Sequence, residues 1–489
     1  METGQRINRV SRLSALYLTP VLIVAGLKMK TDALNDGTLS AGFIWRYYAT
    51  AVVACAGFGY YFARLFSRFF KPAVFISAFV FWAMAFCYWI SFALTKNLPN
   101  ESIFVTVFDT TALHTRDFLK IVPVWIWAAT ALYWAAFALC VKSVKPFDRQ
   151  KGDGLFYGAL CAFFALLCVF TQWPDSLFSR AVKSYRLYAG LKEQIADTVK
   201  NGRTGTVDVF SPETKRTIIV AVGESANRRV FNENIADFEQ KTAFLKNKPV
   251  FIPDATAKHV ATAYVVKDML MPENVNLAAA YKRAGFKTFW LSNHFKSGKH
   301  DNLIYALTRN FDVLRYFNFT QTNQSFEWTS SHHDDVLIAP FAAALNDPAE
   351  KKLIFVHLFG SHFPYTSRYP DATETFILDQ YAASVRYTNT VLAEILKLAE
   401  SSNQNAALLY FSDHGTIPEN PFERFSTVPD MIEVPMFYWL SEPYLKTPLA
   451  KSAKTLAAVK KTTTSETSFI INALSGITVD TRTLDKEPQ

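Results

Sequence analysis

The first third of the chain consists of long apolar runs separated by short polar joints. Five runs carry no charged residue: Leu13–Leu27, Tyr47–Ala63, Pro72–Thr95, Ile121–Val141 and Gly154–Pro174. Several reach the roughly 20 residues that a helix needs to cross a hydrocarbon layer of about 30 Å. Buried core helices of a soluble protein are a poor alternative, because such helices rarely follow one another in this way. The pattern predicts a membrane domain of five transmembrane helices over residues 1–174.

Beyond residue 206 the pattern changes to short apolar strands that alternate with amphipathic helices. The predicted strands are Thr217–Val222, Lys287–Leu291, Leu353–Leu358, Ala406–Phe411 and Val434–Leu440. The predicted helices include Val275–Ala284, Asp334–Leu345, Leu378–Leu398 and Glu466–Leu474. This alternation predicts an α/β domain over 207–489, with a mostly parallel central sheet covered by helices on both faces.

The segment 175–206 joins the two halves. Its first part has apolar and basic residues at helical spacing, which fits either a helix lying on the membrane surface or an amphipathic helix packed on the outer domain. Both interpretations stay open. Residues 201–206 (NGRTGT) are typical of a turn-rich linker.

Charge placement predicts the orientation of the chain. The net charge is +9, and within the membrane half the basic residues are distributed unevenly among the polar joints. Ten Lys and Arg lie within 1–12, 64–71 and 142–153, against six within 28–46 and 96–120. Since positive charge marks the cytoplasmic side, the amino terminus is expected inside and residues 175–489 outside. The first run lacks a clear cleavage site and is expected to remain as an anchor. This placement does not indicate a nucleic-acid partner.

Composition excludes a disordered chain and a disulfide-stabilised outer domain. With 50% hydrophobic residues, including 43 Phe, the chain is not a disordered one. All five cysteines lie in the membrane runs: Cys55, Cys87, Cys140, Cys161 and Cys168. The outer domain therefore has no disulfide framework, although its expected compartment permits one.

Carboxylates and histidines follow several predicted strands. The motifs are Gly223-Glu224-Ser225, Ser292-Asn293-His294, Gly360-Ser361-His362 and Ser412-Asp413-His414-Gly415. Carboxyl ends of parallel strands meet at one edge, where ligands bind. Each motif alone also fits a structural role, such as Asp413 capping a helix. Their recurrence favours a site for zinc or a similar divalent ion.

These residues resemble motifs of the alkaline-phosphatase and sulfatase superfamily. Five crossings followed by such a domain resemble the phosphoethanolamine transferases of Gram-negative envelopes. The resemblance in architecture covers essentially the whole chain, and its motifs lie within Thr217–Leu440: Gly223-Glu224-Ser225, Ala261-Thr262-Ala263-Tyr264, Asn276–Phe286, His357-Leu-Phe-Gly-Ser-His362, Ser412-Asp413-His414-Gly415 and Val434-Pro435 before Trp439-Leu440-Ser441. The most specific match is Ser412-Asp413-His414-Gly415.

The resemblance implies a metal site and a nucleophile. Carried over by position, Glu224, Thr262, Asp413 and His414 hold one zinc ion, and Thr262 is the nucleophile. A threonine hydroxyl is a weak nucleophile at neutral pH, and coordination by a cation lowers its pKa.

Further residues are candidates for other roles near this site. The resemblance implies that His362 contacts the phosphoryl group or a second metal. Substrate contacts are expected from Asn293, His294, Lys258 and His259. The run from His332 to Asp335 is typical of a helix amino end, where the dipole favours acids.

The implied activity transfers phosphoethanolamine from phosphatidylethanolamine to an envelope acceptor. That acceptor is the lipopolysaccharide core, lipid A, another glycan or a protein. The group passes through a covalent threonine intermediate. The protein is then expected in the inner membrane as a multi-pass protein, with its catalytic domain in the periplasm. Three alternatives stay open: a phosphoglycerol transferase of similar architecture, an anchored phosphatase or sulfatase, and an inactive glycan-binding relative.

The chain departs from the family pattern at two places. The cysteines that usually flank the nucleophile are replaced by Lys258 and Asp268, which predicts a salt link tying that loop. A second histidine usually follows Asp-His-Gly by some dozen residues, and residues 416–425 contain none. The number of metal ions therefore stays open. Glu419 and Arg424 are candidates for contacting the phosphate instead.

Overall fold

The computed structural model describes residues 71–95, 122–143, 177–201, 206–209, 215–294, 303–317, 332–420 and 428–480, with a few single positions between 19 and 119. The chain divides into two compact units. A helical unit comprises Met1–Phe108 and His114–Leu187, and an α/β unit comprises Asp109–Leu113 and Tyr188–Gln489.

The described part of the helical unit contains two long apolar helices. They are α3 (Lys71–Thr95) and α6 (Val124–Ser143), which match two of the predicted runs. The helices pack through aromatic side chains, with the rings of Trp82 and Tyr133 4.9 Å apart. Tyr133 also donates a hydrogen bond of 2.6 Å to the carbonyl of Trp82.

The number of membrane crossings stays a prediction. Within the described residues, the segment Val124–Lys142 is long and apolar enough to cross a membrane, and Trp82–Thr95 is a shorter apolar segment. The runs at 47–63 and 154–174 lie outside the described residues, as does the run at 13–27 apart from three single positions.

Helix α8 (Leu177–Asn201) joins the two units. Its carboxyl-terminal half packs on the α/β unit, where Ile195 is fully buried in the core beside Leu191 and Val199. The side chain of Asn310 donates to the carbonyl of Val199 over 2.8 Å. For this half, the packing favours an amphipathic helix docked on the α/β unit.

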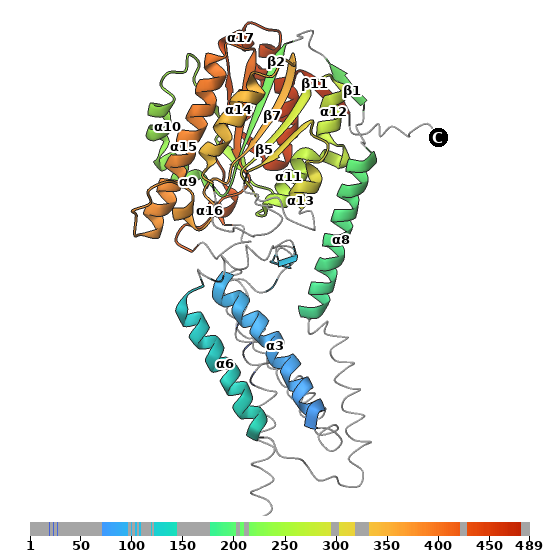
Figure 1. Ribbon diagram of the computed structural model, residues 1–489, viewed down its shortest axis with the longest axis vertical. Coiled ribbons are helices and arrows are strands. Elements are labelled where there is room, and N and C mark those ends of the chain that lie inside the picture. Colours follow the sequence, from blue (N-terminus) through green and yellow to red (C-terminus); the bar gives the residue numbers. More distant parts are fainter. Residues whose placement is uncertain are drawn as a thin grey trace, which may run out of the picture. The chain divides into compact units, whose positions relative to one another are not determined.

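A seven-stranded sheet forms the centre of the α/β unit (Figure 1). Its strand order is β3-β9-β8-β2-β7-β5-β6. The strands are β2 (Arg216–Gly223), β3 (Val250–Phe251), β5 (Lys287–Ser292), β6 (Val313–Tyr316), β7 (Lys351–His357), β8 (Ala406–Ser412) and β9 (Met436–Leu440). All five predicted strands are confirmed. Strands β8, β2, β7, β5 and β6 run parallel, and β9 is antiparallel to both of its neighbours.

Helices cover both faces of this sheet, as predicted. The α-helices are α9 (Arg228–Glu233), α10 (Ile235–Lys241), α11 (Thr262–Leu270), α12 (Leu277–Arg283), α13 (Leu303–Leu307), α14 (Ile338–Leu345), α15 (Ile377–Ser401), α16 (Pro429–Ile432), α17 (Glu442–Leu445), α18 (Leu449–Leu456) and α19 (Thr467–Ser475). Short 3₁₀ helices are η1 (Pro272–Asn274), η2 (Asp334–Leu337), η3 (Tyr365–Ser367) and η4 (Thr464–Glu466).

The sheet separates two hydrophobic cores, and alternate side chains of the central strand β2 point into one core or the other. In β2, Ile218, Val220 and Val222 face a core shared with α11, α12 and α19. Ile219 and Ala221 face the other core, shared with α14 and α15. Strands buried on both faces need continuous apolar runs, which explains why the sequence pattern identified them. Figure 1 shows these helix groups on opposite sides of the sheet.

Two small sheets complete the unit. Strand β1 (Thr206–Val209) pairs antiparallel with β11 (Ile477–Asp480). This pairing ties the first strand of the unit to its last strand. Strand β4 (Asp254–Thr256) pairs parallel with β10 (Lys461–Thr463). Strand β4 precedes Thr262 by six residues in the chain. Between them, the amide of Lys258 donates to Thr464 Oγ1, just after β10, over 3.2 Å.

Candidate metal centre and nucleophile

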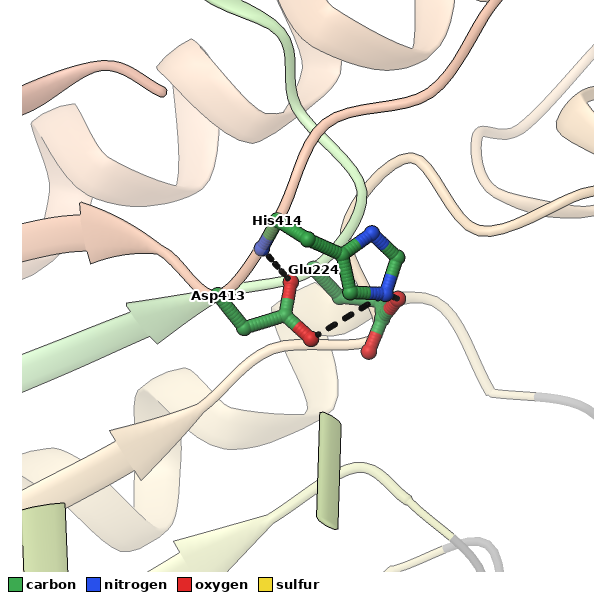
Figure 2. Close-up of side chains that lie close together, drawn as sticks. All are labelled: Glu224, Asp413 and His414. Carbon is green, nitrogen blue, oxygen red and sulfur yellow. Dashed lines mark hydrogen bonds and ion pairs between the residues drawn. The ribbon is translucent and has the colours of Figure 1, made fainter. Parts of the chain in front are cut away.

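Strand register brings the predicted metal ligands together. Gly223 of β2 and Ser412 of β8 are register partners, so Glu224 and Asp413 leave the sheet side by side. Both carboxylates are buried, with 1% and 0% of the residue exposed. His414 follows Asp413 directly, and Figure 2 shows its ring turned toward the two carboxylates.

A strained turn fixes Glu224. The next residue, Ser225, has φ of 61°, a conformation that costs a non-glycine residue of order 1 kcal/mol and is often found at functional sites. Ser225 Oγ donates to Glu224 Oε1 over 2.6 Å, and Ser225 N donates to Asp413 Oδ1 over 3.1 Å. The phenol of Tyr381 stabilises this turn by donating to the Ser225 carbonyl over 2.8 Å.

Backbone hydrogen bonds also orient Asp413 and His414. Oδ1 of Asp413 accepts from His414 N over 2.7 Å, while buried Oδ2 accepts no hydrogen bond from the residues that the structure describes. The ring Nδ1 of His414 lies 2.7 Å from the carbonyl of Gly415, to which it donates. A neutral imidazole with its proton on Nδ1 carries a lone pair on Nε2, which is the form that binds metals.

These three side chains fit a divalent cation. One ligand atom from each of Glu224, Asp413 and His414 lies within 4.8 Å of the others. His414 Nε2 is 3.4 Å from Glu224 Oε1 and 3.5 Å from Asp413 Oδ2. Burial, followed by the charge of Asp413, raises the pKa of Glu224. A cation among these atoms would offset the cost of burying the Glu224 carboxylate and its repulsion by Asp413. It would also give Asp413 Oδ2 a partner.

The hydroxyl of Thr262 lies at this cluster. Thr262 is the first residue of α11, and its Oγ1 donates to Glu224 Oε2 over 2.9 Å. The start of a nine-residue helix presents backbone N–H groups and the positive end of the helix dipole. A negatively charged phosphoryl group beside this hydroxyl would therefore be stabilised. The structure thus brings together all four residues predicted to form the metal site.

The loop after β7, residues 358–362, lies against Glu224 and is called the β7 loop below. Ser361 N donates to the Glu224 carbonyl over 2.9 Å. The loop ends at His362, whose ring stacks on Phe359 at 5.3 Å and whose Nδ1 donates to the Phe363 carbonyl. His362 therefore lies on a segment that is hydrogen-bonded directly to the backbone of Glu224.

Two histidines stack beside Glu224. The rings of His294 and His357 are parallel with centroids 4.0 Å apart. His294 Nε2 donates to the Leu358 carbonyl over 2.8 Å and lies 3.9 Å from Glu224 Oε2. Burial, then the neighbouring His294, lowers the pKa of His357 well below its ordinary value. His357 is thus a neutral core residue, and His294 lies beside Glu224.

Asn293 is placed differently from its predicted role as a substrate contact. It is fully buried, and its amide nitrogen donates to the His332 carbonyl and to Asp334 Oδ1, over 2.9 and 2.8 Å. Both amide hydrogens are therefore used within the protein. A contact between this amide nitrogen and a substrate would require these bonds to break.

Lys258 and His259 lie beside the start of α11. Lys258 Nζ is 3.4 Å from Asp268 Oδ2, which confirms the predicted salt link. His259 Nε2 contacts the same oxygen at 3.1 Å, and its ring lies 5.5 Å from that of Tyr264. Burial would raise the pKa of Asp268, but the hydrogen bond of His259 and the charges of the neighbouring lysines lower it to about 2.

Of the two alternative phosphate contacts, Glu419 lies among the described residues. Glu419 pairs with Arg229 at 3.3 Å, and Arg229 also pairs with Asp430 at 2.7 Å. Arg424 lies outside the described residues.

Known proteins with similar sequences share this domain. A family model described as Sulfatase matches residues 253–475. Phosphoethanolamine transferase EptC of Escherichia coli K12 is 25% identical over 435 residues, covering 75% of this chain and 74% of that protein. Phosphoethanolamine transferase OpgE of the same organism is 22% identical over 433 residues, covering 80% of each.

A solved structure matches both halves of the chain. The integral membrane protein lipooligosaccharide phosphoethanolamine transferase A (EptA) from Neisseria meningitidis has a TM-score of 0.67 and 17% identity over 97% of both chains. This likeness shows that the two proteins share a fold. The family match places a Sulfatase domain at residues 253–475 of the α/β unit, and the relatives by sequence are named phosphoethanolamine transferases.

Proposed function

We propose that this protein transfers phosphoethanolamine from phosphatidylethanolamine to an acceptor of the bacterial envelope, through a covalent intermediate on Thr262. The observation that carries the proposal is the hydrogen bond from Thr262 Oγ1 to Glu224 Oε2, at the edge of the Glu224, Asp413 and His414 cluster. The named relatives support phosphoethanolamine as the transferred group.

The metal proposed for this site is zinc. Glu224, Asp413 and His414 would bind it, with the Thr262 hydroxyl as a fourth ligand, because a small set of carboxylate and imidazole donors suits zinc. When bound, zinc lowers the pKa of a coordinated hydroxyl and offsets charge on phosphoryl oxygens.

In the first step, Thr262 Oγ1 attacks the phosphorus of phosphatidylethanolamine. The bond from Oγ1 to phosphorus forms as the bond from phosphorus to the diacylglycerol oxygen breaks. The hydroxyl proton, directed at Glu224 Oε2 before the attack, leaves Oγ1. One proton is taken up by the diacylglycerol oxygen, so diacylglycerol departs as an alcohol.

In the second step, an acceptor oxygen attacks the phosphorus bound to Thr262. The bond from Oγ1 to phosphorus breaks, Thr262 regains a proton, and the acceptor loses one. The acceptor is lipid A, the lipopolysaccharide core, another glycan or a protein. The helix start at Thr262 and the side chain of His362 would hold the phosphoryl group in both steps.

The membrane half has a physical role in this proposal. A donor with two acyl chains does not dissolve in water, so an enzyme that uses it works best when held at the lipid surface. We place the protein in the inner membrane with the α/β unit in the periplasm. The apolar helices α3 and α6 support this placement.

The proposal is tested with the purified full-length protein in lipid nanodiscs. Phosphatidylethanolamine labelled in its headgroup should label the wild type and Thr262→Ser, whereas Thr262→Ala should stay unlabelled. Label from phosphatidylglycerol alone would identify a phosphoglycerol transferase. Release of inorganic phosphate or sulfate would identify an anchored hydrolase, and absence of all three reactions would identify an inactive relative.

A further inference from the structure

Asp334 is a buried carboxylate that the proposed chemistry does not use. It begins the short helix η2 and is 3% exposed. An acid at a helix start ordinarily caps its own helix or faces solvent. Asp334 accepts instead from Phe359 N over 2.7 Å and from Gly360 N over 2.8 Å, residues 25 and 26 positions away in the chain. A third donor, the amide of Asn293, lies 2.8 Å from Oδ1.

The bonds to Asp334 complete the anchoring of the β7 loop. At its start, Leu358 N donates to the Val222 carbonyl, and near its end Ser361 N donates to the Glu224 carbonyl, both over 2.9 Å. The two amides in between are the ones that Asp334 accepts. Because consecutive N–H groups are all bonded, the loop has little freedom to move without breaking a buried hydrogen bond.

The β7 loop touches the backbone of Glu224 closely. A side-chain carbon added at Gly360 would lie 2.6 Å from the Glu224 carbonyl oxygen and 2.9 Å from its nitrogen. Gly360 also has φ of 49°, which glycine adopts without strain. Any displacement of the loop toward β2 must therefore displace Glu224 as well.

We propose that Asp334 is a positioning residue of this site, which fixes the β7 loop and through it sets Glu224 and His362. The inference rests on the proposed function, because Glu224 is taken as a metal ligand and His362 as a phosphoryl contact. Both oxygens of Asp334 are already used as acceptors within the protein. These two oxygens accept from two adjacent amides of the loop. The loop in turn restricts the position of Glu224 through the hydrogen bond from Ser361 N to the Glu224 carbonyl.

The test compares Asp334→Asn with Asp335→Asn in the full-length protein. The asparagine keeps the volume of Asp334 but presents an NH₂ group to one of the two loop amides, so one bond is lost. Asp335 is a matched control, because it is the next residue of η2, is exposed, and interacts with Tyr387 rather than with the loop. Zinc affinity is measured by competition with a chromophoric chelator, alongside kcat, KM and the unfolding temperature.

We expect Asp334→Asn to bind zinc about 10- to 100-fold more weakly, which is the usual effect of losing a residue that orients a metal ligand. At saturating zinc, kcat should fall while KM for the donor lipid stays within about twofold, since the loss falls on alignment and not on lipid binding. Asp335→Asn should match the wild type. Unchanged zinc affinity and kcat in a folded Asp334→Asn protein would overturn the inference.

Two further measurements keep the test decisive. If Asp334→Asn does not fold, Asn293→Ala removes one donor and leaves the carboxylate; a smaller loss of zinc affinity supports the inference, and no loss overturns it. If the wild type binds no zinc, the proposed function fails instead. Hydrogen exchange then decides: faster exchange of the β7 loop amides in Asp334→Asn than in Asp335→Asn supports the positioning role, and equal exchange rejects it.

Discussion

The hydroxyl of Thr262 donates a hydrogen bond of 2.9 Å to Oε2 of Glu224, although the two residues are 38 positions apart in the chain. Glu224 leaves the carboxyl end of a central strand, and Thr262 begins a helix on one face of the sheet. Their contact places a candidate nucleophile at a cluster of side chains that could hold a metal ion.

Removing one metal ligand should separate metal binding from folding. Asp413→Asn leaves Ser225 N and His414 N with an acceptor, but its neutral amide is a poor zinc ligand. We expect zinc affinity at least about 100-fold weaker and an unfolding temperature that no longer falls on dialysis against a chelator. Calorimetry with and without chelator checks this. The control Glu419→Gln changes an exposed ion pair with Arg229. Its zinc affinity, and the fall of its unfolding temperature on treatment with chelator, should match those of the wild type.

A methyl group at position 360 should disturb the metal site. Gly360→Ala adds a carbon against the backbone of Glu224 at a positive φ, so we expect a loss of about 1 to 3 kcal/mol in unfolding free energy, with weaker zinc binding. The matched control is Gly190→Ala in α8, where an added carbon meets nothing within 4 Å. It should be neutral or slightly stabilising. Equal behaviour of the two variants would contradict the close contact at Glu224.

The salt link at Asp268 should stabilise the protein only while its carboxylate is charged. The pKa of Asp268 is lowered to about 2 in the folded protein, below its unfolded value of about 3.9. This stabilisation is therefore full above about pH 5 and is lost as the pH falls toward 2. Partial exposure of Lys258 reduces its size to about 1 to 2 kcal/mol. Denaturant unfolding of the wild type and Asp268→Asn should differ by this amount at pH 7 and converge near pH 2. A constant difference would refute the account.

The same salt link should also affect the nucleophile. Asp268 lies on α11, six residues after Thr262, and holds Lys258 and His259 of the preceding loop. We expect Asp268→Asn to lower kcat by about two- to tenfold, because the loop before the nucleophile loses its anchor. Asp254→Asn is a suitable control, since Asp254 is an exposed partner of Arg228. Headgroup transfer from labelled phosphatidylethanolamine measures both variants.

The sequence pattern predicted those features that depend on neighbouring residues. The strands β2, β5, β7 and β8 were identified because a strand buried on both faces must be apolar throughout. Glu224, Asp413 and His414 were identified because residues that follow parallel strands meet at one edge. The antiparallel direction of β9 was not predicted, because alternation of strands and helices does not fix the direction of an edge region.

Other features depend on contacts between distant segments. Thr262 was found only through its family resemblance, since nothing local distinguishes it from other threonines. Asp334 and Tyr381 were missed as supports of the site. Asp334 has the local pattern of a helix start, and its bonds to the β7 loop exist only once the sheet has formed. Tyr381 reaches Ser225 across 156 positions of the chain.

The central claim is that Thr262 carries the transferred group. The most direct measurement is peptide mass spectrometry of the full-length protein after brief incubation with phosphatidylethanolamine in the absence of acceptor. We predict a phosphoethanolamine adduct on the peptide that contains Thr262, located on that residue by fragmentation and absent from Thr262→Ala. Transfer to acceptor without any adduct, or with an adduct on another residue, would contradict the account.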